Sequence, residues 1–187
     1  AASWQALAWL RADANLTLSV NRIKDYTDYV QHVDTYDNWS ETGKTTAMNY
    51  GTTTMLMSPS LTGMARLSFK PWYHASSSLK TMELSMDGKY VGKQYMDNTM
   101  TDSRSIPAYF VSNLAVSYSF PLSGSVGFAR EDSVRISFYV NNVFNNMYYA
   151  DGWCWKNLIE EDGALADGIG VYPQAPINCM LKVSWRF

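Results

Sequence analysis

The chain has 187 residues, a formal net charge of −2 and only 17% charged residues, so its charge gives no reason to expect nucleic-acid binding. No stretch of about 18 consecutive apolar residues is present, which excludes a protein built on transmembrane helices. Aromatic residues make up 14% of the chain, yet the mean hydropathy is −0.23. This combination fits strands with one apolar and one polar face, either in a transmembrane β-barrel or in a Tyr-rich soluble β-sandwich.

Two cysteines, Cys154 and Cys179, are too few for a disulfide framework and do not form a metal-binding motif. The sequence begins Ala-Ala-Ser, without Met and without a signal peptide. We therefore expect a processed protein or a part of a larger one, with free thiols and no metal site.

Side chains that alternate between apolar and polar predict a series of strands, because successive side chains of a strand point to opposite faces. The expected strands are residues 3–10, 15–30, 61–72, 79–95, 108–120, 134–149 and 177–187. The expected connections are short near 11–14, 71–78 and 121–132, intermediate at 96–106, and long at 32–54 and 150–171. Short turns on one side and long loops on the other are typical of outer-membrane barrels.

The last stretch, 177–187, has the clearest alternation. Its apolar face consists of Ile177, Cys179, Leu181, Val183, Trp185 and Phe187, and its other face holds Asn178, Lys182, Ser184 and Arg186. A chain that ends on such a strand is typical of a transmembrane barrel, whose last strand must close the sheet. The count of about seven strands is odd, whereas bacterial single-chain barrels have even numbers. Either one strand is miscounted, or the chain is the tail of a larger barrel.

Several motifs occur in a characteristic order. They are Asn141-Asn-Val-Phe-Asn-Asn-Met-Tyr-Tyr149, Gly92-Lys-Gln-Tyr-Met-Asp-Asn-Thr99 followed by Arg104, Tyr109 and Phe110, then Tyr172-Pro-Gln-Ala175, and the terminal Trp185-Arg-Phe187. Together they resemble the C-terminal part of the barrel of TonB-dependent outer-membrane receptors, over roughly residues 15–187.

This resemblance implies an all-β fold, an antiparallel transmembrane β-barrel of about 22 strands, of which residues 1–187 would be the C-terminal segment. It also implies a plug domain that this chain lacks and a location in the bacterial outer membrane. Members of the family import a scarce ligand: a siderophore, cobalamin, haem or an oligosaccharide. The implied partners are outer-membrane lipid, an extracellular small ligand, the plug domain and TonB through the missing N-terminal part, and in some members a surface lipoprotein.

Catalysis receives little support from the sequence. The two histidines, His32 and His74, fall in an expected outer loop and an expected periplasmic turn, too far apart to share a site. The acidic residues of the long loops match no calcium-binding pattern. We expect no catalytic residue, no metal and no cofactor.

The candidate ligand-binding residues are Tyr148, Tyr149, Trp153 and Trp155, in and just before the expected loop at 150–171. Exposed aromatic rings can stack on sugars or planar ligands. The alternative is an aromatic belt, in which Trp and Tyr lie at the level of the lipid headgroups.

Charged residues on the polar strand faces are expected to line a barrel lumen, because Arg or Lys facing lipid would cost about 2–4 kcal/mol at the membrane midplane. They are Arg66, Lys70, Glu83, Asp87, Lys89, Arg135, Lys182 and Arg186. Two other architectures stay open, a complete eight-stranded outer-membrane barrel and a soluble ligand-binding β-barrel. The strongly polar face of residues 79–95 argues against the soluble barrel, which needs an apolar interior.

Overall fold

A computed structural model describes residues 1–76, 78–121 and 133–186, which fold almost entirely into β-strands. The strands are β1 (Ala2–Leu7), β2 (Leu10–Leu18), β3 (Arg22–Asp34), β4 (Ser40–Thr54), β5 (Leu61–Phe69), β6 (Glu83–Val91), β7 (Gln94–Tyr95), β8 (Ser105–Ile106), β9 (Tyr109–Pro121), β10 (Ser133–Asn141), β11 (Tyr149–Ile159), β12 (Leu165–Pro173) and β13 (Asn178–Arg186). Two short 3₁₀ helices, η1 (Ser78–Thr81) and η2 (Asp102–Arg104), interrupt them. The expected all-β, mainly antiparallel fold is confirmed.

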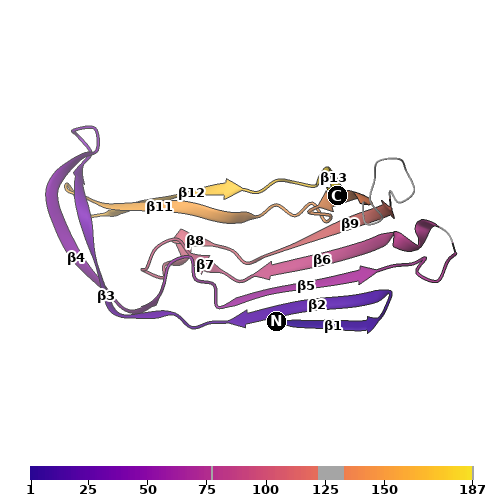
Figure 1. The fold of residues 1–187 in the computed structure, drawn as a ribbon. Helices are drawn as coiled ribbons and strands as arrows, with labels where there is room; N and C mark the ends of the chain where they lie inside the picture. The colour runs from indigo at the N-terminus through magenta and orange to yellow at the C-terminus, as the bar shows by residue number, and fades with distance from the viewer. Residues whose placement is uncertain (77, 122–132, 187) are drawn as a thin grey trace.

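The main sheet has seven strands in the order β1-β2-β5-β6-β9-β10-β13, and all its pairs are antiparallel (Figure 1). Each of the seven expected ranges overlaps one of these strands. The expected strand 15–30, however, covers only the end of β2 and continues into β3, and the expected strand 134–149 ends at Asn141. The sheet is open in the described part of the chain, with β1 and β13 at its edges. A closed barrel, which the resemblance implies for the whole receptor, is not formed by these strands.

The register of the main sheet keeps apolar residues on one face. Leu84, Val116, Phe138 and Leu181, for example, lie directly opposite one another on neighbouring strands. Much of this face is exposed, including the side chains of Trp4, Leu7, Leu16, Leu18, Leu67, Met86, Tyr90, Phe110, Leu114, Ile136, Phe138, Leu181, Val183 and Trp185. The main sheet therefore presents a broad apolar face that the described residues leave uncovered.

The opposite face of the main sheet is polar and paired across strands, as expected. Arg66 lies opposite Asp87, and its Nη2 donates a hydrogen bond to Asp87 Oδ1 over 3.1 Å. Asn113 continues the row, with its Nδ2 donating to Asp87 Oδ2 over 2.8 Å. Arg135 makes an ion pair with Glu83 on the same face at 3.6 Å.

A second sheet of four strands has the order β12-β11-β3-β4 and is built from two long hairpins. In Figure 1 these hairpins extend from one end of the main sheet, which we call the loop end; the opposite end, with the β1–β2 and β5–β6 connections, is the turn end. The hairpins meet through a short parallel pairing of β11 with β3, where Leu158 lies opposite His32.

The sequence-based assignment of residues 32–54 and 150–171 to loops was wrong. Register shifts between Ile23 and Thr27 and between Gln31 and Val33 break the alternation on which a strand prediction depends. Smaller corrections concern 11–14, which lies inside β2 rather than in a connection, and 79–81, which is helical. Phe187 and most of the expected turn at 121–132 lie outside the described residues.

The buried core lies at the loop end rather than within the main sheet. Ile106 is completely buried, and it belongs to the same core as Val30, Val33, Val91, Met96, Val111 and Leu158. These residues come from both hairpins, from the main sheet and from residues 92–108, the segment between β6 and β9. No helix among the described residues is long and apolar enough to cross a membrane.

Candidate functional site

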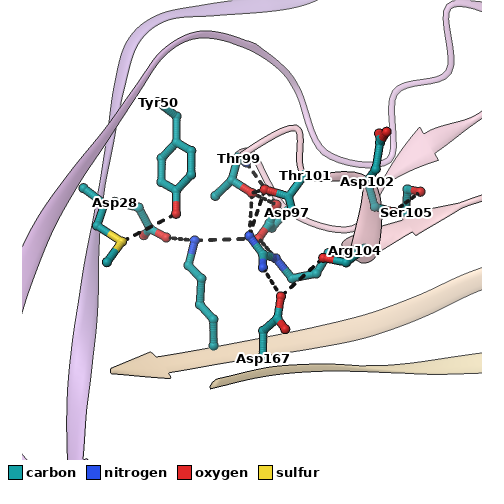
Figure 2. A network of polar contacts seen from close by, with 12 residues as sticks. Asp28, Tyr50, Asp97, Thr99, Thr101, Asp102, Arg104, Ser105 and Asp167 are labelled. Atoms are coloured by element: carbon teal, nitrogen blue, oxygen red, sulfur yellow. Dashed lines mark hydrogen bonds and ion pairs between the residues drawn. The ribbon is translucent and has the colours of Figure 1, made fainter. Parts of the chain in front are cut away.

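Arg104 is the centre of a polar network at the loop end, and only 1% of its surface is exposed. Its Nε donates a hydrogen bond to Asp97 Oδ2 over 2.8 Å, and its Nη2 donates to Thr99 Oγ1 at 2.9 Å and Thr101 Oγ1 at 3.1 Å (Figure 2). Its Nη1 donates to the carboxylate of Asp167 in β12. A guanidinium suits this position because it offers several donors in a fixed plane.

The Asp97 carboxylate is held in its ionised form by the same network. Burial alone would raise its pKa, but hydrogen bonds from the hydroxyl and amide of Thr99 and from Arg104 hold the pKa below its ordinary value. Burial would lower the pKa of Arg104, and Asp97 and Asp167 together raise it instead. Both partners therefore stay charged at neutral pH.

Lys156 extends the network from β11 to β3. Its largely buried Nζ makes an ion pair with Asp28, lies 3.7 Å from Asp97 Oδ2 and 5.0 Å from the centroid of the Tyr50 ring. Within the described residues this Nζ makes no hydrogen bond of ordinary geometry. Lys156 thus contacts residues of β3, β4 and the 92–108 segment from its position in β11.

A second set of contacts connects the outer part of the two hairpins. His32 Nδ1 lies 2.8 Å from Glu160 Oε2, and His32 Nε2 lies 2.7 Å from Thr46 Oγ1. Lys44 also pairs with Glu160, and its hydrogen bond and the one with His32 lower the pKa of that half-buried carboxyl. His74 lies between β5 and η1 at the turn end, so the structure keeps the two histidines apart.

The Asn-rich motif at 141–149 connects strands at the base of the β11–β12 hairpin. Asn142 is buried, and its Nδ2 donates to the carbonyl oxygens of Asn146 at 2.9 Å and Ala175 at 3.2 Å. Its Oδ1 accepts from the Asn146 amide at 3.0 Å. Asn145 Oδ1 accepts from the Ile177 amide at 2.9 Å. These asparagines build the turn that precedes β11.

The motif at 92–99 is also structural. The Gly92 amide donates to the Leu61 carbonyl oxygen over 2.8 Å, and a Cβ at Gly92 would lie 3.0 Å from that oxygen. Asn98 Oδ1 accepts a hydrogen bond from the Leu56 amide at 2.8 Å. With Asp97 and Thr99 bound to Arg104, this motif packs the 92–108 segment against its neighbours.

The four predicted ligand-binding residues separate into two groups. Tyr148 stacks on Tyr109 with the ring centroids 4.7 Å apart, and Tyr149 begins β11 opposite Pro173. Trp153 and Trp155 lie two residues apart on the same face of β11. The structure therefore brings together the two Trp residues, and it places Tyr148 in an aromatic contact with the main sheet.

Each of these Trp side chains lies against a glycine of β12. A Cβ at Gly170 would lie 2.3 Å from Trp153 Nε1, and a Cβ at Gly168 would lie 2.7 Å from Trp155 Nε1. Trp39, from the β3–β4 turn, makes an edge contact with Trp155 at 6.3 Å between centroids. Trp153 stays 51% exposed and Trp155 38%. Sequence reasoning missed Trp39, which is remote in the chain.

The loop end is acidic. Residues 22–54, 92–108 and 149–173 contain twelve Asp and Glu against six Lys and Arg, a net charge of −6 in a chain whose total is −2. Among the residues that the structure describes, His, Cys, Asp and Glu form no group of three that could hold a metal ion.

Neither a family model nor a curated protein matches this sequence. Among solved structures, the chain is similar to BauA, the ferric preacinetobactin receptor from Acinetobacter baumannii, with a TM-score of 0.47 and 13% identity. The match covers 96% of this chain but only 27% of the receptor chain. A likeness this remote assigns neither a family nor a function.

Proposed function

We propose that this chain is the C-terminal barrel segment of a TonB-dependent outer-membrane receptor and helps to bind and import a scarce extracellular ligand. One observation carries the proposal: the main sheet exposes a broad apolar face and carries paired charges on the other face. A sheet between lipid and a polar lumen needs this division. A soluble β-barrel would instead bury its apolar face.

The connections of the main sheet support an orientation. Residues between Leu7 and Leu10 make a tight turn between β1 and β2, whereas β2 and β5 are connected through the whole β3–β4 hairpin. Short periplasmic turns and long extracellular connections are the rule in outer-membrane barrels. The loop end would therefore face the outside of the cell.

The two edges of the main sheet favour a segment of a larger barrel over a complete small one. Strands β1 and β13 do not pair with each other, and an unpaired edge is not tolerated in the hydrocarbon layer. Further strands of the parent receptor, about 22 in total as the resemblance implies, would cover both edges. The plug domain, TonB and any surface lipoprotein would act through parts outside this chain.

In this proposal the network around Arg104 holds the extracellular hairpins in a fixed arrangement. The polar row that includes Arg66 and Asp87 lines the lumen. Tyr148, Tyr149, Trp153 and Trp155 remain our proposed ligand contacts, with the two Trp residues directly accessible.

The decisive experiment measures whether folding depends on detergent. Far-UV circular dichroism and heat-modifiable gel mobility would be recorded for the full chain with and without micelles. We expect β-structure and a heat-dependent mobility shift only with micelles, because the apolar face needs an apolar environment. A chain that is folded and monodisperse in plain buffer would overturn the proposal.

A further inference from the structure

We propose that the outer face of the β11–β12 hairpin binds an uncharged saccharide, by stacking of sugar rings on Trp153 and Trp155. This inference rests on the proposed function, which places the hairpin outside the cell. It names the ligand class and defines the site as Asp151, Trp153, Trp155 and Asn157 of β11 with Tyr172 of β12.

The site follows the alternation of β11. Asp151, Trp153, Trp155 and Asn157 point to one face, and neighbouring members of this row are about 6.6 Å apart along the strand. Tyr172 pairs with Asp151 across the hairpin. The row thus consists of two indoles with a carboxylate at one end and an amide at the other.

The indoles are held in place before any ligand binds. Gly170 and Gly168 lie opposite Trp153 and Trp155 in the register, and the absence of a Cβ leaves the space in which each indole lies. Trp39 contacts the Trp155 ring from the side. Rings that are already ordered lose little conformational freedom on binding, which favours affinity.

The neighbouring polar groups select a saccharide over lipid. A sugar ring combines an apolar C–H face, which can stack on an indole, with hydroxyl groups at its edge. Asp151 and Asn157 lie at the two ends of the row and can form hydrogen bonds with such hydroxyls, and Asp151 Oδ1 already accepts a hydrogen bond from the Gly152 amide at 2.7 Å. Hydrocarbon would leave these groups unsatisfied, at a substantial cost in free energy.

The charge of the loop end disfavours an anionic ligand. A net charge of −6 over residues 22–54, 92–108 and 149–173 repels anions and slows their association. The carboxylate of Asp151 lies within the row itself, so an anionic group bound there would face it directly. A neutral oligosaccharide is repelled neither by this net charge nor by the Asp151 carboxylate.

The test uses the full chain in detergent micelles, with Trp fluorescence followed during titration with maltohexaose, cellohexaose and laminarihexaose. We expect saturable binding of at least one of these neutral glucans. Trp153→Ala and Trp155→Ala should each weaken it by about tenfold, as expected for loss of an aromatic stacking contact. Trp153→Phe should restore part of the affinity, because a smaller ring still stacks.

Two further variants separate a stacking site from a general loss of structure. Gly170→Ala keeps both indoles but occupies the space beside Trp153, and it should weaken binding without changing the circular dichroism spectrum. Trp4→Ala is the matched control, because it removes an exposed Trp, 67% accessible, from the main sheet and should leave binding unchanged.

Three outcomes would overturn the inference. The first is no binding tighter than about 1 mM for any of the three glucans, and the second is binding that Trp153→Ala and Trp155→Ala do not weaken. The third is quenching of the fluorescence of these two residues by brominated lipid, which would place them in a membrane belt. The proposed function is tested independently. Micelle-dependent folding without glucan binding would overturn only the saccharide inference. Glucan binding by a chain that folds in plain buffer would overturn only the proposed outer-membrane role.

Discussion

Arg104 and Asp167 lie 63 residues apart in the sequence, yet the guanidinium of one donates a hydrogen bond to the carboxylate of the other. This contact joins the 92–108 segment to β12, and the bonds from Arg104 to Asp97 and Thr99 hold that segment in its folded shape. One buried side chain therefore connects parts of the loop end that are remote in the chain.

Replacing Arg104 with Met should loosen the loop end while leaving the main sheet intact. The substitution leaves Asp97 and Asp167 without their positive partner, and loss of one member of a buried pair costs about 3–5 kcal/mol. We expect about 3 kcal/mol, because the Asp167 side chain is 31% exposed and water can partly replace the lost contact. Hydrogen exchange should become faster across 92–108 and 149–173.

Arg66→Met is the matched control for this prediction. Arg66 also pairs with an aspartate, Asp87, but its side chain is 48% exposed and solvent screens the pair. We expect less than about 1 kcal/mol for this change. Similar acceleration of hydrogen exchange in both variants would show that burial of Arg104 does not determine the stability of the loop end.

Acid should open the loop end through Asp97. Its pKa in the folded chain is lowered from the ordinary value of 3.8, so its stabilising contribution is complete above that value and is lost as the pH falls through the lower, folded pKa. Hydrogen exchange of residues 92–108, corrected for the intrinsic pH dependence, should therefore accelerate below about pH 4. Asp97→Asn should remove most of this pH dependence, and an unchanged profile in that variant would assign the effect to other carboxyls.

The strands of the main sheet could be predicted because their two faces meet different surroundings. Residues 61–72 and 108–120 alternate over most of their length, and the structure places β5 and β9 there. The hairpin strands have no such division, since register shifts in β3 interrupt the alternation and polar residues occupy both faces. Alternation indicates a strand whose two faces meet different surroundings. Strands without such a difference between their faces cannot be predicted from alternation.

Only part of the Arg104 network could be predicted from the sequence. Arg104 and Asp97 belong to stretches that resemble a receptor family, but their chemistry depends on Asp167, whose position is set by the pairing of β11 with β12. Residues 150–171 were expected to be a loop, but Lys156 lies opposite Asp167 in the β11–β12 register, so these opposite charges could have indicated a hairpin. The contact of Trp39 with Trp155 depends on how two separate hairpins meet and had no local signal.

Asn142 should be the most sensitive position of the Asn-rich motif. It has a positive φ of 51° and is buried with all its side-chain bonds made inside the protein. Asn142→Ala removes these bonds and forces an alanine into a left-handed conformation, and we expect a loss of about 2–4 kcal/mol in the free energy of unfolding in micelles.

Asn145→Ala provides the comparison, because Asn145 has the same φ of 51° but is exposed and accepts one hydrogen bond from the Ile177 amide. The backbone penalty is therefore shared, and the difference between the two variants isolates the buried bonds of Asn142. Equal losses would mean that backbone strain alone accounts for the effect.

The two faces of the main sheet should respond oppositely to a positive charge. Leu114 and Ala115 are neighbours in β9, an inner strand of the main sheet, and Leu114 lies on the exposed apolar face while Ala115 lies on the polar face. If the apolar face contacts lipid, Leu114→Arg should reduce the free energy of unfolding in lipid vesicles by about 2–4 kcal/mol, and Ala115→Arg should change it by less than about 1 kcal/mol. The pair controls for strand position and for the size of the new side chain, so only the face differs. If Ala115→Arg were the more damaging change, the polar face would be the buried one, and the assignment of a lipid face and a lumen face would have to be reversed.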